Sequence, residues 1–415
     1  LNFSNFDDKF NLTVILLRII FPYLLMVSLA ALMMGILNSI KNFWISAAAP
    51  IALNLSLIFA MIFISPLFGD TPEKKVYGLA LGVLVGGILQ FAFQFIPVIM
   101  KGFHIYPFFK FAHEGLRKVI RLMLPTIYGQ AIHEVNIIVD TMLAWGLGTG
   151  AVSYLYYSNH LMQLPLGVFT IAISTVILPL LSRNVANNSK DEFKKSLFYG
   201  MEMVLFIMLP CSIILLLGGK EIIYILFERG KFDHISTMET YFTLCFYSIG
   251  LVFISGVRIM VQAFYANKDT KTPVNVAIIA MILNIILNLI LIRFLRWGGL
   301  ALATSISAMF NFSVLIILLK KRVPEIRWSE DITAFLKIIG ASFVMAVSAG
   351  IIRILFAPDK IILIQNQFLN YIIFLVILCC LSGGIYLLSC HLSKVEVMST
   401  LFKIFLHKEK KEIRK

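Results

Sequence analysis

The chain has 415 residues, of which 59% are hydrophobic and 14% are charged, and its formal net charge at pH 7 is +14. Soluble globular domains average about 25% charged residues, so the composition excludes an ordinary soluble protein and indicates a membrane protein. A membrane β-barrel is excluded because the apolar runs are continuous, at ~20 residues or more, rather than alternating. The five cysteines lie in apolar runs without Cys-x-x-Cys spacing, so neither a disulfide framework nor a zinc site is indicated.

Apolar runs long enough to cross a membrane recur along the whole chain. We expect an all-α polytopic membrane protein whose spans are joined by short connections. Eleven spans are predicted, at 13–39, 43–67, 77–100, 117–145, 149–184, 192–218, 237–266, 272–295, 298–320, 332–357 and 362–390. The stretch 219–236 is too short and too charged to span, and we expect a separate interfacial helix there.

Lysine and arginine are concentrated in alternate connections and in the tail 393–415. Short cytoplasmic loops carry an excess of these residues, so the pattern predicts a cytoplasmic C-terminus and an external residue 1. The basic tail has a rough apolar face and is predicted to lie along the inner membrane surface. A start at Leu1, outside and before an odd number of spans, leads us to expect further helices upstream.

Polar side chains gather in the two spans on either side of 146–150. A charged side chain at bilayer depth costs about 2.5–3.5 kcal/mol, so these residues must face protein or a wet cavity. Helical spacing predicts two stripes, one formed by His133, Asn136 and Asp140 and the other by Tyr156, His160 and Gln163. We expect the two stripes to face each other across a polar cavity.

A second polar group involves the spans 272–295 and 298–320. Asn284 and Asn288 share one face of the first span, and Thr304 lies in the second. Together with Asp140 they supply carboxylate, amide and hydroxyl oxygens, which suit a hard cation such as Na⁺. The alternative is that the amides and the hydroxyl only join helices by hydrogen bonds, and that Asp140 carries a proton.

Other polar residues are candidates for binding an anionic headgroup. His160 and Gln163 share a helix face, although a single histidine is also compatible with simple packing. Arg258, in line with Gln262, lies ~12 Å from the inner end of its span, where it either binds phosphate or extends to the interface. Glu134 is a candidate proton relay or ion-pair partner; a zinc protease motif is excluded because position 137 is isoleucine.

Several stretches resemble the MurJ/MviN family of lipid II flippases, in the exporter superfamily that also holds the MATE multidrug antiporters. They are LLRIIFPYLLMVSLAALMMGILN (16–38), FWISAAAPIALNLSLI (43–58), NIIVDTMLA (136–144), YYSNHLMQLPLGVFTIAISTVILPLLS (156–182) and QAFYANKDTKTPV (262–274). The resemblance implies a MATE-like helical bundle of fourteen helices in two lobes around a central cavity, of which about eleven are present here.

The same resemblance implies a division of this chain into four parts. They are the remainder of an N-lobe (1–116), a C-lobe (117–320), two additional helices that form a lipid groove (321–392) and a basic amphipathic cytoplasmic tail (393–415).

The resemblance also assigns roles to residues. It implies roles in substrate binding for His160 and Gln163, to which the residue patterns add Tyr156, Arg258, Gln262 and Glu134, and it implies a Na⁺ set of Asp140, Asn284, Asn288 and Thr304. The family's cavity arginine in the YYxxR pattern is His160 here, so headgroup binding is expected to be weaker or pH-dependent. Asn288 stands where a carboxylate is possible, which lowers the negative charge of the Na⁺ set.

We therefore expect a bacterial inner-membrane flippase for lipid II, serving peptidoglycan and cell wall biogenesis and hence cell shape. It would be a transporter rather than an enzyme, since no ATP-binding or nucleophile motif is found. The expected partners are lipid II, membrane lipids and the cell-wall synthesis machinery, without nucleic acid; no cofactor is expected beyond Na⁺ or the membrane potential as driving force. The alternatives are an exporter of another lipid-linked oligosaccharide, a cation-coupled multidrug antiporter and a non-transporting scaffold.

Overall fold

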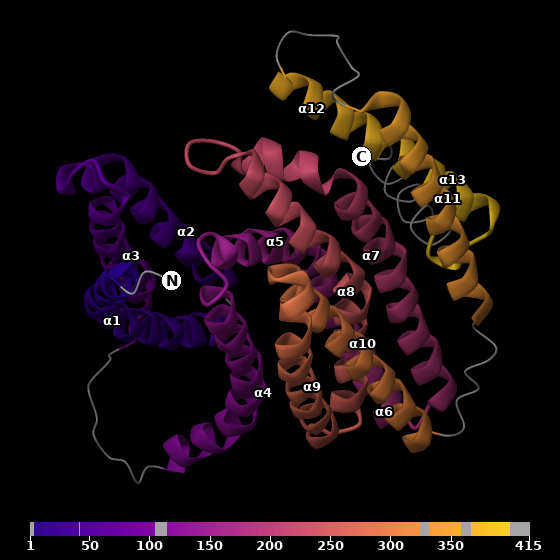
Figure 1. Cartoon of the computed structure of the whole chain (residues 1–415). Helices are drawn as coiled ribbons and strands as arrows, with labels where there is room; N and C mark the ends of the chain where they lie inside the picture. Colours follow the sequence, from indigo (N-terminus) through magenta and orange to yellow (C-terminus); the bar gives the residue numbers. More distant parts are fainter. Residues whose placement is uncertain (1–3, 41, 104–113, 324–331, 358–366, 399–415) are drawn as a thin grey trace, which may run out of the picture. The chain divides into compact units, whose positions relative to one another are not determined.

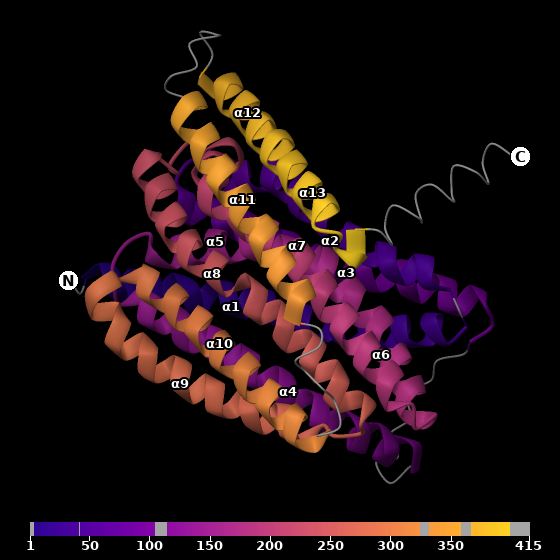
Figure 2. The ribbon, with the colours of Figure 1, turned by 90° about the vertical axis from the view of Figure 1, so that its right-hand side faces the viewer.

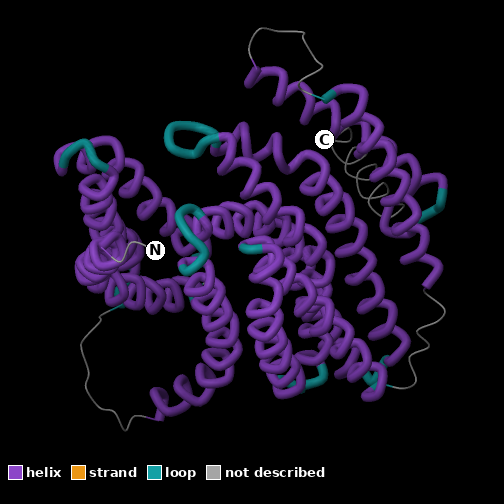
Figure 3. Tube along the Cα trace, in the orientation of Figure 1, coloured by secondary structure: helices purple, strands orange, loops and turns teal. Residues whose placement is uncertain are grey.

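The computed structural model describes residues 4–40, 42–103, 114–323, 332–357 and 367–398, and every regular element in these ranges is a helix (Figures 1 and 3). Helices dominate because a backbone in lipid must satisfy its own hydrogen bonds. In the described part of the chain, ten helices are long and apolar enough to cross a membrane. The chain divides into two compact units, Leu1–His113 and Glu114–Lys415.

The first unit contains three long helices, α1 (Ser4–Ser39), α2 (Phe43–Phe59) and α3 (Pro72–Met100); the π-helical η1 (Ala60–Ile64) and the 3-10 η2 (Ser65–Phe68) extend α2. Helix α3 packs against both α1 and α2. Its glycines make this contact close, since a Cβ on Gly82 would lie 2.4 Å from Ala60 and one on Gly86 2.6 Å from Leu53. Small residues at four-residue spacing let membrane helices approach closely.

The second unit holds the remaining helices, and α8 lies at its centre. The elements are α4 (Glu114–Trp145), α5 (Ala151–Pro165), the π-helical η3 (Leu166–Thr170), α6 (Ile171–Ala186), α7 (Lys190–Phe227), α8 (His234–Ala266), α9 (Lys271–Leu295), α10 (Trp297–Arg322), α11 (Ile332–Phe356), α12 (Gln367–Ile377), the π-helical η4 (Leu378–Ser382) and α13 (Gly383–Leu392). Helix α8 packs against α5, α6, α7 and α10, while α9 packs against α10 and α4 against α9.

The last helices pack on the outside of α7, as Figure 2 shows for α11 and the pair α12–α13. The face between α11 and α13 is filled, because Met345 of α11 and Tyr386 of α13 belong to one buried apolar cluster with Phe206 of α7. The Tyr386 hydroxyl also donates a hydrogen bond to the Phe206 carbonyl at 2.8 Å. Val395 and Val397 extend this cluster past α13, and 399–415 lie outside the described residues.

The prediction of a separate interfacial helix at 219–236 is wrong. Helix α7 continues without a break to Phe227, and only 228–233 separate it from α8. Helix α7 continues through Gly218 and Gly219, where the lack of side chains lets its neighbours pack closely. A Cβ on Gly218 would lie 2.9 Å from Leu378, and one on Gly219 would lie 3.0 Å from Leu244.

The charge that argued against a span at this point is paired inside the protein. Glu221 is 3% exposed, and its Oε1 lies 3.5 Å from Nη2 of Arg353 on α11. Arg353 also donates a hydrogen bond to the Leu217 carbonyl through Nη1. The charge of Glu221 is thus neutralised by Arg353, which lies far from it in the sequence.

Replacing Arg353 with alanine should destabilise the contact between α7 and α11, because it leaves the Glu221 carboxylate buried without its cation. Breaking a buried pair from one side costs about 3–5 kcal/mol. Thermal unfolding in detergent measures this loss, with Lys337→Ala at an exposed site on α11 as the matched control. The double variant Glu221→Gln with Arg353→Met should recover most of the stability; equal loss in the control and in Arg353→Ala would contradict the role of the pair.

Candidate functional site

A chain of side-chain hydrogen bonds joins α4, α9 and α10. Nδ2 of Asn288 donates to Oδ1 of Asp140 at 2.6 Å and to Oδ1 of Asn284 at 2.9 Å. Nδ2 of Asn284 donates to Oγ1 of Thr304 at 3.3 Å, and the Thr304 hydroxyl donates to the Leu300 carbonyl at 3.1 Å. The structure therefore brings together the four residues of the predicted oxygen set.

The side chains of Asn284 and Asn288 are fully buried. Asn284 and Asn288 are both 0% exposed, and Asp140 is half-buried. A buried polar group without a partner costs about 1–3 kcal/mol, so the chain of hydrogen bonds stabilises the contacts among the three helices. Oδ1 of Asn288 is nevertheless buried without a hydrogen-bond partner in the described structure. The amide thus uses its hydrogens and leaves its oxygen unsatisfied.

The cation implied for this cluster is Na⁺, and the arrangement of the donors does not fit it. A hard cation needs oxygen atoms directed at one point. Here the Asn288 amide nitrogen reaches both the Asp140 and Asn284 oxygens, so the group between them presents hydrogens. The predicted Na⁺ role stays a prediction, and the direction of the hydrogen bonds argues against it.

The predicted stripe on α5 is more exposed than this buried cluster. Tyr156 and His160 are exposed and Gln163 is half-buried. The two rings lie 4.0 Å apart between centroids, and Nδ1 of His160 is 3.0 Å from the Tyr156 carbonyl. Because a carbonyl only accepts, Nδ1 carries a hydrogen and Nε2 is the nitrogen left for a ligand. When His160 is protonated, Nε2 becomes a charged donor for an anion.

The two predicted stripes do not meet through hydrogen bonds among the described side chains. Asp140 contacts Asn288 of α9, whereas His160 contacts its own helix. Asn136 keeps a buried Oδ1 without a partner in the described part of the chain, and Glu134 is exposed. The side chain of His133 lies outside what the structure describes.

Arg258 and Gln262 of α8 line a hollow of about 440 Å³ against α6. The facing residues include Ser174 and Thr175, whose hydroxyls are bonded to the carbonyls of Thr170 and Ala172. Arg258 is half-buried, and no ion pair of its guanidinium occurs among the described residues. Both hydroxyls already donate their hydrogens to carbonyls, so an anionic ligand in this mainly apolar hollow would be bound by Arg258 and Gln262.

The chain matches a known protein family along most of its length. The family model described as "Lipid II flippase MurJ" matches residues 3–392. The chain belongs to the MurJ lipid II flippase family. A solved structure described as "Lipid II flippase MurJ, inward closed conformation" is 28% identical, covers 89% of this chain and 73% of its own, and has a TM-score of 0.70.

Curated MurJ relatives agree with the family assignment. A protein of Vibrio cholerae serotype O1 named "Probable lipid II flippase MurJ" is 38% identical over 307 residues, which are 74% of this chain and 58% of that relative. A protein with the same name from Buchnera aphidicola subsp. Acyrthosiphon pisum is 33% identical over 405 residues, 97% of this chain and 77% of the relative. In the Vibrio comparison, the chain spans less than two thirds of the relative's length.

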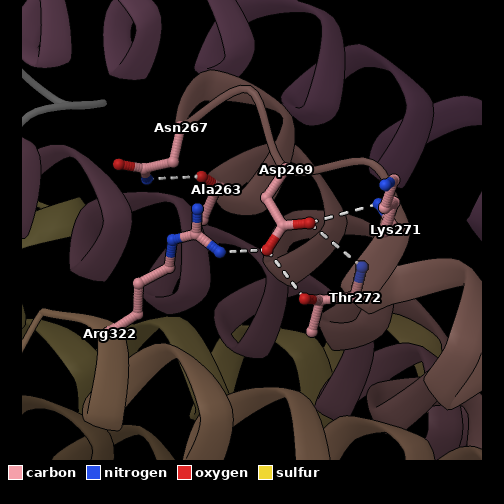
Figure 4. A network of polar contacts seen from close by, with 6 residues as sticks. All are labelled: Ala263, Asn267, Asp269, Lys271, Thr272 and Arg322. Atoms are coloured by element: carbon pink, nitrogen blue, oxygen red, sulfur yellow. Dashed lines mark hydrogen bonds and ion pairs between the residues drawn. The ribbon is translucent and has the colours of Figure 1, made fainter.

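A polar network at the α8–α9 turn was not predicted as part of any site, although its segment was quoted for its resemblance to the MurJ family. Asp269 accepts hydrogen bonds at Oδ1 from the backbone N–H groups of Lys271 at 3.1 Å and Thr272 at 3.0 Å (Figure 4). Its Oδ2 accepts from the Thr272 hydroxyl at 2.7 Å and from Arg322 of α10. An aspartate just before the predicted span 272–295 was a signal for a helix N-terminus that sequence reasoning could have used.

The Asp269 carboxylate is stabilised in its charged form. Burial alone would raise its pKa, but the Thr272 and Lys271 hydrogen bonds and the Arg322 charge outweigh this and hold the pKa below the ordinary value of 3.8. A depressed pKa contributes stability that is present above the unfolded value and is lost as the pH falls through the folded value. The network therefore ties the α8–α9 turn to the end of α10 at neutral pH.

Replacing Asp269 with asparagine should lower the free energy of unfolding by about 1.5–3 kcal/mol at neutral pH, the range for a hydrogen bond to a charged group. The wild type should lose this advantage below pH 3.8, so that the two unfolding curves converge in acid. Thermal unfolding against pH measures this, with Asp70→Asn at an exposed position as the control. A difference between wild type and Asp269→Asn that stays constant through the acid range would contradict the assignment.

Proposed function

We propose that the protein moves lipid II from the cytoplasmic to the periplasmic leaflet of the bacterial inner membrane by alternating access. The observation that carries this proposal is the MurJ family match over residues 3–392. The half-buried Arg258 in its hollow supports it, because a lipid-linked diphosphate needs a cation at membrane depth. Transport of this kind requires no chemical step.

The headgroup would be bound by residues of the second unit. Arg258 and Gln262 hold the diphosphate, since a guanidinium binds phosphate oxygens in a bidentate manner. The exposed ring of Tyr156 offers an apolar surface to the sugars, and His160 and Gln163 supply hydrogen bonds. Glu134, exposed on α4, is suited to the amino groups of the peptide.

The polyprenyl tail would remain in lipid along the last helices. The expected groove lies between α11 and the pair α12–α13, where the described residues near α13 are closely packed. An apolar hollow of about 650 Å³ opens on the other face of α11, between α7, α8 and α10. Phe198, Phe253 and Phe335 are among the residues that line it. Because α11 and α13 are packed together, the polyprenyl tail would lie in this hollow instead of between them.

The lysines and arginines of the connections support a cytoplasmic C-terminus in a multi-pass inner-membrane protein. The sequence leaves two candidate driving forces, a Na⁺ gradient and the membrane potential. The hydrogen-bond donors of Asn288 favour the membrane potential. The partners would be lipid II, membrane lipids and the cell-wall synthesis machinery.

Complementation tests the function and the Arg258 role together. A bacterium depleted of its own lipid II flippase should be rescued by the full-length protein and by Arg183→Ala, an exposed control on α6. Arg258→Ala should fail or rescue poorly, since losing a charge-assisted hydrogen bond of about 1.5–3 kcal/mol reduces binding about tenfold or more.

Arg258→Lys should rescue in part, because it keeps the charge without the bidentate geometry. Membrane abundance of each variant is measured alongside growth. Failure of the wild type at normal abundance would favour another lipid-linked oligosaccharide or a drug antiporter, whereas rescue by Arg258→Ala would keep the function and remove the site.

Lipid II flipping in vesicles should be faster in the variant His160→Arg than in the wild type, because arginine is always charged and offers a bidentate donor to an anion. The variant His160→Leu, which offers no donor, should be slower than the wild type. Equal rates in all three proteins at equal abundance would show that His160 does not contact the anionic headgroup.

A further inference from the structure

The hydrogens of the Asn288 amide lie where a cation would be expected. The nearest acceptors are the Asp140 carboxylate at 2.6 Å and the Asn284 carbonyl oxygen at 2.9 Å, which come from α4 and α9. An amide NH₂ group has two hydrogens, and both are directed at these oxygens. One neutral group thereby bridges two acceptors, as a bound cation would do.

The neighbours of the two amides fix their orientation. The Thr304 hydroxyl donates its hydrogen to the Leu300 carbonyl, so its oxygen is free to accept from Asn284. This turns the Asn284 oxygen toward Asn288, which must then present its nitrogen. At the other end, the Asp140 carboxylate repels a carbonyl oxygen and likewise requires a nitrogen from Asn288. Both ends of the chain therefore select the same orientation.

The Asn288 oxygen shows the consequence of this orientation. It is buried and has no hydrogen-bond partner in the described structure, while Asn288 as a whole is 0% exposed. If the amide were turned so that this oxygen faced Asp140, the two oxygens could both bind a cation. Without a cation, two acceptors would lie 2.6 Å apart and repel each other. The amide leaves its oxygen unsatisfied and uses its hydrogens to close the cluster.

We propose that the Asn288 amide takes the place of a cation, so that the cluster of Asp140, Asn284 and Thr304 is closed without Na⁺. A single substitution, Asn288→Asp, would then convert it into a cation site. That change removes the two bridging hydrogens and places a second carboxylate beside Asp140, and two adjacent carboxylates both stay ionised only if a cation lies between them. Oxygen ligands from α4, α9 and α10 would then suit Na⁺.

Thermal unfolding of the purified full-length protein in detergent tests this, with NaCl replaced by KCl or choline chloride at constant ionic strength. The wild-type midpoint should be the same in all three salts. The Asn288→Asp midpoint should rise by about 3 °C or more in NaCl over choline chloride, since a ligand stabilises the state that binds it. The exposed control Asn187→Asp should show no salt preference.

Two outcomes would overturn the proposal. One is a Na⁺-specific stabilisation of the wild type that Asp140→Asn abolishes, which would show that the native cluster binds Na⁺; this arm needs no folded Asn288→Asp protein. The other is a folded Asn288→Asp variant that shows no preference for Na⁺. Unfolding alone is measured, so both outcomes are independent of the molecule that the protein transports.

Discussion

A polar side chain at bilayer depth is stable only when another protein group satisfies it, and the second unit depends on this constraint. The hydrogen bonds of Asn288 connect α4 to α9, and those of Asn284 connect α9 to α10. Helix α10 in turn packs along α8, the centre of the unit. Lipid gives little apolar driving force between helices, so directional contacts of this kind, together with close packing at small residues, determine which helices meet.

The second unit uses its polar groups in two distinct ways. The cluster around Asn288 and the pair of Glu221 with Arg353 are bonded inside the protein and hold helices together. Arg258 and His160 are instead open to a hollow or to the surroundings, and the hydrogen bond of His160 within the described residues goes to its own helix. A bound headgroup is best recognised by groups of the second kind, because their binding capacity is not already used.

Hydropathy predicted ten of the eleven spans, because twenty apolar residues have few alternatives to a helix across a membrane. The predicted span 117–145 forms helix α4 but is not among the ten candidates in the described residues. Four-residue spacing also brought Asn284 and Asn288 to one face, as the structure confirms. The failure at 219–236 arose because Glu221 is neutralised by Arg353, which is distant in sequence. The contact between Asn288 and Asp140 was likewise beyond prediction, because the two residues are 148 positions apart in the chain.

The π-helical turn η3 adds one residue to a helical turn between α5 and α6. One residue corresponds to about 100° of rotation in an α-helix, so the faces before and after this turn are not continuous. Tyr156 and His160 are exposed before it, whereas Thr170, seven positions after Gln163, is fully buried and donates a hydrogen bond to Ser255 of α8 at 3.0 Å. Deleting one residue from this turn would therefore rotate the face of α5 that carries Tyr156 and His160 by about 100° relative to α6, while every hydrophobic span stays intact.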